Sequence, residues 1–197
     1  IKNMSTEFFE KKNKIKQIFE NDSNGIIYAG LCTILTDNLI KDLFNHLQEI
    51  KYKKLKSKVT ILALGGYGRG ELAPKSDIDL LFLVDNQSSS KTNIFSSEKF
   101  IEEVLYFFWD LGFSVGHSTR TIKETFDFAK QDLTFLTSLI DHRLLAGEVK
   151  IFEEFQKFYQ TFLKNYNTFE FIKRKLDEAN KRHEKYGASR FLVEPNV

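Results

Sequence analysis

The sequence predicts an α+β fold in which a small mixed β-sheet has helices before and after it in the chain. Two short, largely apolar runs predict buried strands, at residues 59–64 and 77–84. A glycine-rich stretch lies between them, as expected of a turn. On both sides of these runs, apolar residues recur at helical spacing. The sheet is therefore expected to be a small core within a mostly helical chain.

Helices are expected ahead of the first strand. The apolar residues between Glu7 and Glu20 recur with near-helical spacing, and a second such stretch runs to about Ile50. Asp22 or Ser23 is the candidate cap of that second helix. The basic residues 51–58 then form a linker into the strand at residues 59–64.

Further helices and one more strand are expected after residue 84. Residues 85–97 have little periodicity and predict a polar loop, and Ser97 precedes a helix that ends near Gly112. Phe113 to Val115 would start a third strand that closes at Gly116. Four more helices are expected, at residues 121–130, 133–145, 148–163 and 168–186, with Gly147 and Gly187 as stops. The domains would be a helical lead (1–50), a core (51–125) and a helical extension (126–197).

The composition narrows the possible classes of protein. The chain has 197 residues, of which 42% are hydrophobic and 28% charged, as is ordinary for a soluble globular protein. A net charge of +2 gives no argument for nucleic acid, and no apolar run is long enough for a membrane span or a signal peptide. The single cysteine excludes an internal disulfide and a multi-thiolate metal site. We therefore expect a cytoplasmic protein without a nucleic-acid or membrane partner.

Two carboxylates stand at the head of the second strand, after the glycine-rich stretch. Side chains alternate along a strand, so Asp77 and Asp79, here called the acid pair, point to the same side. Two parallel carboxylates suit a hard divalent cation such as Mg²⁺. Gly65 and Gly66 begin a turn in which backbone N–H groups can approach a phosphate closely. The pattern predicts nucleotide chemistry.

Two other glycine-rich phosphate sites do not fit the spacing. A dinucleotide-binding fold needs a helical crossover of a dozen residues or so, but only residues 72–76 separate the glycine-rich region from the acidic strand. The glycines at positions 65, 66, 68 and 70 also do not give G-x-G-x-x-G. A Walker-type loop is excluded because no Gly-Lys-Ser/Thr follows.

A Gly-Gly turn, ten intervening residues and Asp-x-Asp on a strand resemble the signature of the DNA polymerase beta superfamily of nucleotidyltransferases. The resemblance implies a polymerase-beta-like nucleotidyltransferase core. It implies that Gly65 and Gly66 hold the triphosphate, while Asp77 and Asp79 hold Mg²⁺ as the metal ligands and catalytic residues.

Segments further along the chain resemble, in order, the bacterial bifunctional PII uridylyltransferases. These segments are Leu64 to Leu72, Ser76 to Leu81, Trp109-Asp110-Leu111, Val115-Gly116-His117-Ser118-x-Arg120-Thr121, Asp132-Leu133-Thr134, Arg143-Leu144-Leu145-x-Gly147, Arg182-His183-x-x-Tyr186 and Leu192-x-Glu194-Pro195-Asn196. The resemblance implies transfer of UMP from UTP to a tyrosine of the nitrogen-regulatory protein PII. It also implies that the family continues into a uridylyl-removing HD domain and ACT domains, so the chain is expected to be a fragment.

Three further residues are candidate phosphate ligands. Arg69 lies on the turn, Ser76 directly precedes the acid pair, and Arg120 follows the third strand; each also has a structural interpretation, such as an ion pair of Arg69 with Glu71. Trp109, Asp132 and Arg143 are interpreted as core or buried-polar positions.

Many members of the superfamily have a third carboxylate on the strand after the acid pair. Residues 113–119 contain none, and Asp110 and Glu124 only flank that segment. The general base for the acceptor hydroxyl is therefore unassigned.

Two alternative functions stay open at this point. One is a related nucleotidyltransferase with another NTP or acceptor, such as a protein adenylyltransferase, since backbone and carboxylates do not read the base. The other is a non-catalytic module that binds nucleotide or PII.

Overall fold

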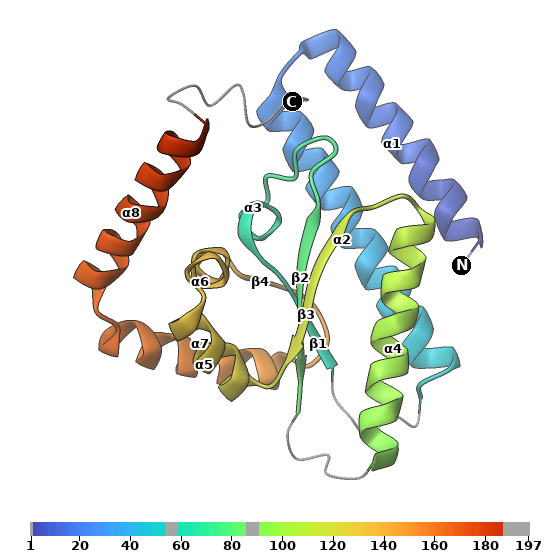
Figure 1. Ribbon diagram of the computed structural model, residues 1–197. Helices are drawn as coiled ribbons and strands as arrows, with labels where there is room; N and C mark the ends of the chain where they lie inside the picture. The colour runs from blue at the N-terminus through green and yellow to red at the C-terminus, as the bar shows by residue number, and fades with distance from the viewer. Residues whose placement is uncertain (1, 54–58, 86–90, 187–197) are drawn as a thin grey trace.

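A computed structural model describes residues 2–53, 59–85 and 91–186 of the chain. The helices are α1 (Lys2–Asp22), α2 (Gly25–Ile50), α3 (Gly65–Gly68), α4 (Lys91–Asp110), α5 (Ile122–Gln131), α6 (Leu133–Ile140), α7 (Val149–Asn165) and α8 (Thr168–Tyr186). The strands are β1 (Val59–Ala63), β2 (Ile78–Val84), β3 (Val115–Arg120) and β4 (Arg143–Ala146). The predicted α+β class, with a small mixed sheet and helical parts before and after it, is confirmed (Figure 1).

The sheet has the strand order β3-β2-β1-β4. β1 pairs antiparallel with both β2 and β4, whereas β2 pairs parallel with β3. Ile61 faces Phe82 across the first pair, and Asp79 faces Gly116 across the parallel pair. The parallel register therefore sets β3 directly beside the acid pair.

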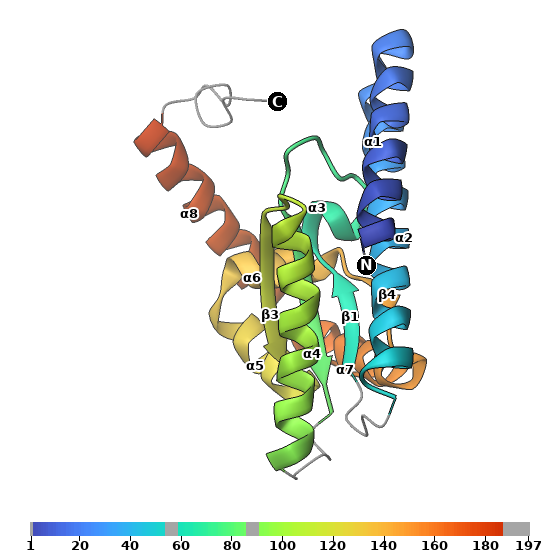
Figure 2. The same cartoon turned by 90° about the vertical axis from the view of Figure 1, so that its right-hand side faces the viewer.

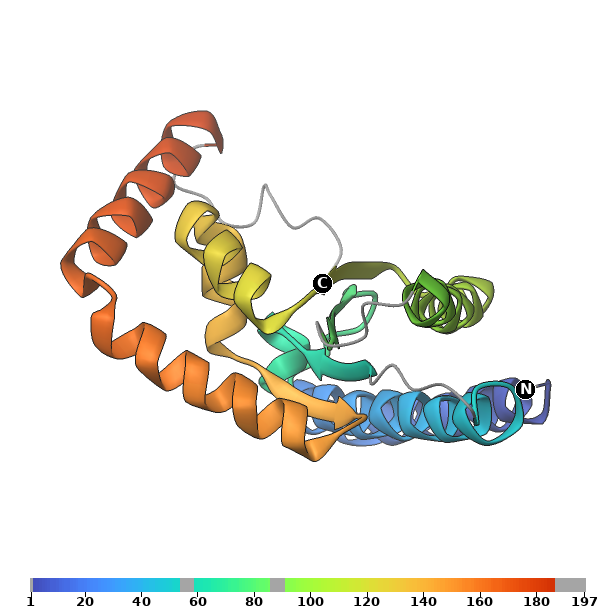
Figure 3. The same cartoon turned by 90° about the horizontal axis from the view of Figure 1, so that it is seen from below.

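Helices cover both faces of the sheet, and side chains of β1 and β2 alternate between two cores. Ile61 and Phe82 pack in the core formed with α1, α2 and α4, whereas Leu62 and Leu81 pack in the core formed with α5, α6 and α7. Figures 2 and 3 show these two groups of helices on opposite sides of the strands. Both strands are buried on both faces, which explains why their sequences are apolar without strict alternation.

Several helix and strand boundaries differ from the prediction. α1 begins at Lys2, before Glu7, and Asn24 caps α2 in place of Asp22 or Ser23. The Asn24 Oδ1 accepts hydrogen bonds from the N–H groups of Ile26 and Ile27, both at 3.1 Å. Sequence analysis missed this cap because Asp22, Ser23 and Asn24 are consecutive and each is of a residue type that commonly caps helices.

The prediction of a polar loop at residues 85–97 was wrong for its second half, because α4 begins at Lys91 rather than after Ser97. The first turns of α4 carry mostly polar residues, so no apolar periodicity marked them. The third strand starts at Val115 and runs to Arg120, past the predicted end at Gly116. Residues 54–58, 86–90 and 187–197, including the predicted stop at Gly187, lie outside the described residues.

The helix predicted at residues 133–145 was also wrong in its last part. α6 ends at Ile140, and residues 143–146 form β4 on the free edge of β1. The three apolar residues that follow Arg143 are too few to be assigned to strand or helix by periodicity alone. Gly147 does end an element, with φ at +109°, and an added Cβ there would lie 2.4 Å from the Val59 carbonyl oxygen.

The division into lead, core and extension stays a prediction. Among the described helices, none is both long enough and apolar enough to cross a membrane.

Candidate active site

The acid pair lies at the start of β2, beside the glycine turn, which is defined here as residues 65–68 and forms α3. Asp77 directly precedes the strand and is exposed, while Asp79 is its second residue and is half-buried. The Asp79 carbonyl oxygen accepts a hydrogen bond from the Leu64 N–H at 3.0 Å. The main chains of turn and strand are thereby joined at the acid pair.

The carboxylate of Asp79 lies between two glycines. A Cβ added at Gly65 would stand 3.5 Å from Asp79 Oδ2, and one added at Gly116 would stand 2.2 Å from Asp79 Oδ1. Gly116 therefore leaves the space that the carboxylate occupies. Gly65 has φ at +57°, a left-handed conformation that glycine adopts without steric cost.

The glycine turn presents unpaired backbone donors next to this carboxylate. The first hydrogen bonds of the turn run from Gly68 N–H to the Leu64 oxygen (2.9 Å) and from Arg69 N–H to the Gly65 oxygen (3.0 Å). Within the described residues, no group accepts a hydrogen bond from the N–H of Gly65 or Gly66. These donors are available to an anion such as a phosphate.

The acid pair fits a hard divalent cation. Burial, and next the charge of Asp77, raise the pKa of Asp79 above its usual value. No hydrogen bond or ion pair from the described part of the chain reaches the Asp79 carboxylate. Across the same residues, no group of three or more His, Cys, Asp or Glu is placed to hold a metal. Two carboxylates without further protein ligands suit an ion such as Mg²⁺, which takes its other ligands from water and substrate.

The raised pKa of Asp79 gives a testable pH dependence of stability. The pKa of Asp79 is higher in the folded chain than in the unfolded chain, so ionisation of Asp79 destabilises the fold. The free energy of unfolding therefore falls as the pH rises through the folded-state pKa. In metal-free buffer at pH 7 we expect Asp79→Asn to melt at a higher temperature than wild type. The difference should shrink as the pH is lowered toward about 4. Thermal melts across this range in EDTA measure it, and an Asp79→Asn variant that melts lower at pH 7 would contradict it.

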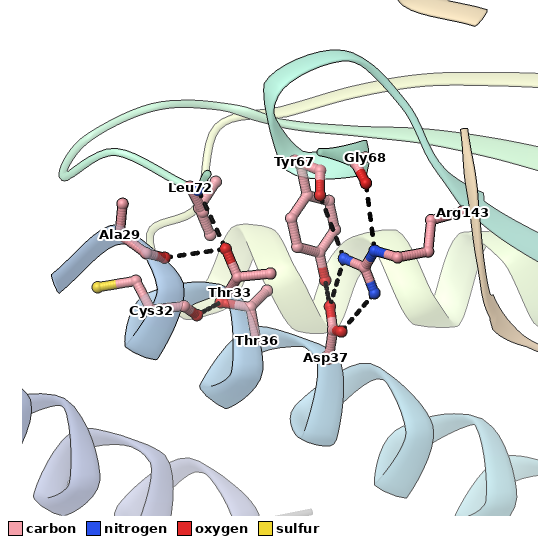
Figure 4. Close-up of polar contacts among 9 residues, drawn as sticks. All are labelled: Ala29, Cys32, Thr33, Thr36, Asp37, Tyr67, Gly68, Leu72 and Arg143. Atoms are coloured by element: carbon pink, nitrogen blue, oxygen red, sulfur yellow. Dashed lines mark hydrogen bonds and ion pairs between the residues drawn. The ribbon is translucent and has the colours of Figure 1, made fainter. Parts of the chain in front are cut away.

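A partly buried ionic network holds the glycine turn against α2 and β4 (Figure 4). The Arg143 guanidinium donates two hydrogen bonds to the Asp37 carboxylate, and the Tyr67 hydroxyl donates to the same carboxylate at 2.8 Å. Arg143 also donates to the carbonyl oxygens of Tyr67 (3.1 Å) and Gly68 (3.3 Å). Burial, followed by the charge of Asp37, raises the pKa of Tyr67 well above its usual value, so its hydroxyl stays a donor.

A second contact from α2 holds the chain after the turn. The Thr33 hydroxyl accepts a hydrogen bond from the Leu72 N–H at 3.0 Å and donates to the Ala29 carbonyl oxygen at 2.9 Å. The segment between the turn and the acid pair is thus fixed to α2. The helical lead therefore contributes directly to the position of the candidate site.

Of the predicted phosphate ligands, Arg69 is placed at the glycine turn. It forms ion pairs with Asp141 (2.7 Å) and Glu71 (3.2 Å), and its side chain is 49% exposed. Ser76 is exposed and its hydroxyl donates to the Asp77 carbonyl oxygen at 3.3 Å, as expected of a residue that caps the strand entry. A role in phosphate binding stays a prediction for both.

Arg120 is not brought to the acid pair. It is the last residue of β3 and pairs with Leu83, four residues along β2 from Asp79, or about 13 Å at the usual rise. Its guanidinium lies 3.9 Å from the centroid of the Phe128 ring. Its Nε is buried without a hydrogen-bond partner among the described residues. The proposed contact of Arg120 with phosphate stays a prediction.

Neither flanking acid supplies a third carboxylate. Glu124 is held in the capping box of α5, where it accepts from the Thr121 N–H at 2.8 Å, and Asp110 is exposed at the end of α4. The structure instead brings Asp141 to the turn, through its ion pair with Arg69. Sequence analysis missed Asp141 because the residue follows a helix end that was not predicted.

Arg143 and Asp132 are partly buried and form structural hydrogen bonds, Arg143 to Asp37 and Asp132 from the Phe135 N–H at the start of α6. The core interpretation of Trp109 was wrong, because its side chain is 44% exposed. Sequence analysis also missed the role of Asp37. Its spacing from Thr33 and Ile40 places its carboxylate on the buried face of α2, where a carboxylate needs a partner.

Comparisons with known proteins agree with this geometry. The family model described as nucleotidyltransferase domain matches residues 43–140, from within α2 to the end of α6. The chain is 36% identical, over 98% of its length, to the bifunctional uridylyltransferase/uridylyl-removing enzyme of Phenylobacterium zucineum. Enzymes of the same name from Caulobacter vibrioides and Rhodopseudomonas palustris are 38% and 34% identical over 92% and 98% of the chain. The chain spans about a fifth of the length of these relatives, at 21%, 19% and 21%.

Proposed function

Because the chain belongs to the nucleotidyltransferase family, we propose that it transfers UMP from UTP to a tyrosine of the protein PII and releases pyrophosphate. The observation that carries the proposal is the Asp79 carboxylate between Gly65 and Gly116, next to backbone donors that have no partner in the described chain. The names of the relatives favour UTP as the donor, and the motif resemblance favours PII as the acceptor.

Asp77 and Asp79 are the residues proposed to hold Mg²⁺, which when bound would neutralise charge on the phosphates. The N–H groups of Gly65 and Gly66 would donate hydrogen bonds to the triphosphate, and Arg69 would be a further donor. Arg69 can serve in this way only if it gives up part of its pairing with Asp141 or Glu71.

In the proposed reaction the tyrosine oxygen of PII forms a bond to the α-phosphorus of UTP. The bond from that phosphorus to the bridging α,β-oxygen breaks, and pyrophosphate leaves with the bonding electrons. The hydroxyl proton passes to a general base, for which no residue is assigned among those that the structure describes. The backbone donors are fixed before the substrate arrives, so they need little reorganisation as charge moves to the leaving group.

The test is incubation of the chain with PII and each of the four NTPs, labelled at the α-phosphate, with Mg²⁺ or with EDTA. We expect PII to be labelled from UTP alone, only with Mg²⁺, and at least about 100-fold more slowly by Asp77→Asn or Asp79→Asn. Asp110→Asn is the matched control, because it removes an exposed carboxylate at the end of α4.

Other outcomes distinguish the alternatives. Transfer that survives in both acid-pair variants would overturn the proposed metal site. Transfer from ATP alone would support a protein adenylyltransferase. Mg²⁺-dependent UTP binding without transfer to PII would support a non-catalytic module.

A further inference from the structure

A cavity of about 370 Å³ lies on the other face of the sheet from Asp79, between α1, α2 and the loop that leads to the acid pair. Its lining includes Phe8, Lys12, Tyr28, Cys32, Lys75 and Phe113. Phe8, Leu35 and Leu72 belong to the core that α1, α2 and α4 share with the sheet, whereas Asp79 faces the other core. The cavity therefore lies on the face of the sheet opposite Asp79, but it shares Ser76, a predicted phosphate ligand, with the candidate active site. Its volume is within the range of small-molecule sites.

The charged side chains among the described residues that line this cavity are all basic. Its lining contains two lysines and no carboxylate. The Lys12 Nζ lies 5.8 Å from the centroids of both the Phe8 and Phe113 rings, and no described carboxylate forms an ion pair with it. Burial raises the pKa of the Cys32 thiol above its usual value, and the hydrogen bond with Tyr28 and the charge of Lys12 oppose this only in part, so Cys32 stays neutral.

The walls combine this cation with aromatic surface and hydroxyls. Phe8, Tyr28 and Phe113 supply aromatic side chains to the lining. Thr36 and Ser76 also belong to it, and their hydroxyls donate to the carbonyl oxygens of Cys32 (2.9 Å) and Asp77 (3.3 Å). An anionic group placed at Lys12 would pair with its ammonium, while an apolar body would pack on the rings. From this arrangement, we propose that the cavity binds a small organic anion with an aromatic or branched apolar body, of the class of arylacetates.

An occupant of the cavity would touch both chain segments that fix the acid pair. Residues 72–76 line the cavity and lead directly into Asp77, and the Ser114 carbonyl oxygen accepts from the N–H of Ile78 at 3.0 Å. Lys75 has φ at +63°, a left-handed conformation that is unfavourable for a non-glycine residue. This loop therefore depends on its surroundings for its shape. The bound anion is expected to change the Mg²⁺ affinity of the acid pair, a consequence that rests on the proposed function.

The test of the site is calorimetric titration of the full chain with phenylacetate, and with phenylacetamide as its uncharged counterpart. We expect phenylacetate to bind at least about 10-fold more tightly than the amide, a preference that Lys12→Gln abolishes. Cys32→Phe, which fills the cavity, should remove binding of both. Lys14→Gln is the matched control, because it neutralises an exposed lysine of α1 outside the cavity. Absence of phenylacetate binding, equal binding of the amide, or binding unchanged in both cavity variants would overturn the proposal.

The coupling is tested by titrating Mg²⁺ against the melting temperature with and without saturating phenylacetate. A shift in the Mg²⁺ midpoint that disappears in Lys12→Gln supports an effector role, and an unchanged midpoint overturns that role. Neither experiment uses a nucleotide or PII, so a negative result in the transfer assay is distinguishable from failure of this proposal.

Discussion

Replacing Gly116 by alanine is expected to lower the rate of nucleotidyl transfer about 100-fold while the chain stays folded. The added Cβ would stand 2.2 Å from Asp79 Oδ1, closer than such atoms approach in proteins, so the carboxylate must move by the better part of an ångström. Backbone atoms of the neighbouring strand are less affected, because the Asp79 Cα lies 4.0 Å from the same position. The Mg²⁺ midpoint in thermal melts should rise together with the loss of rate.

Gly30→Ala is the matched control for this substitution. Gly30 lies inside α2, and an added Cβ there meets no atom within 4 Å. The control variant should keep its transfer rate and gain about 0.5–1 kcal/mol of stability, as alanine does in a helix interior. A Gly116→Ala variant that transfers UMP as fast as Gly30→Ala would show that the carboxylate position seen here is not the one used in transfer.

The fold was largely predictable because its strongest signals are local. The α8 bounds agree with residues 168–186, and β1 agrees with the predicted strand within one residue. The strand β4 was not predictable in this way, because this segment of four residues gains its strand conformation from pairing with β1. Tertiary contact, rather than propensity, decides such a short segment.

In the candidate site, too, the local motif was predictable and the contacts from distant residues were not. The acid pair and Gly65 come from a continuous stretch of 15 residues, and the structure places the Asp79 carboxylate beside Gly65. Arg120 was assigned by its position just after the predicted strand end, but β3 extends to that residue and carries it away from Asp79. Asp37 and Asp141 reach the turn from positions 30 or more residues distant, and no local pattern records such contacts.

The network of Asp37, Tyr67 and Arg143 explains how distant segments fix the glycine turn. Asp37 is buried on α2, and its carboxylate receives all its described side-chain hydrogen bonds from Arg143 and Tyr67. A buried carboxylate that loses its partner cation pays its desolvation cost without compensation. The network also holds the Tyr67 and Gly68 carbonyl oxygens, so its loss would release the turn as well as α2.

Arg143→Met is therefore expected to destabilise the chain by about 3 kcal/mol, measured by urea denaturation. Because the Asp37 side chain is only 13% exposed, the value falls within the range for a broken buried pair. It belongs at the lower end of that range because the Arg143 side chain is 32% exposed. Tyr67→Phe removes one hydrogen bond to the same carboxylate and should cost about 1–2 kcal/mol. The transfer rate should fall in both variants, measured where each is still folded.

The double variant Asp37→Leu with Arg143→Met separates fold from function. Removing both charges leaves no buried ion without a partner, so stability should recover by at least about 1 kcal/mol relative to Arg143→Met. The transfer rate should not recover, because the carbonyl oxygens of Tyr67 and Gly68 still lack the donors that hold the turn. Recovery of both stability and rate would mean that the network only balances charge, and that the glycine turn keeps its position without it.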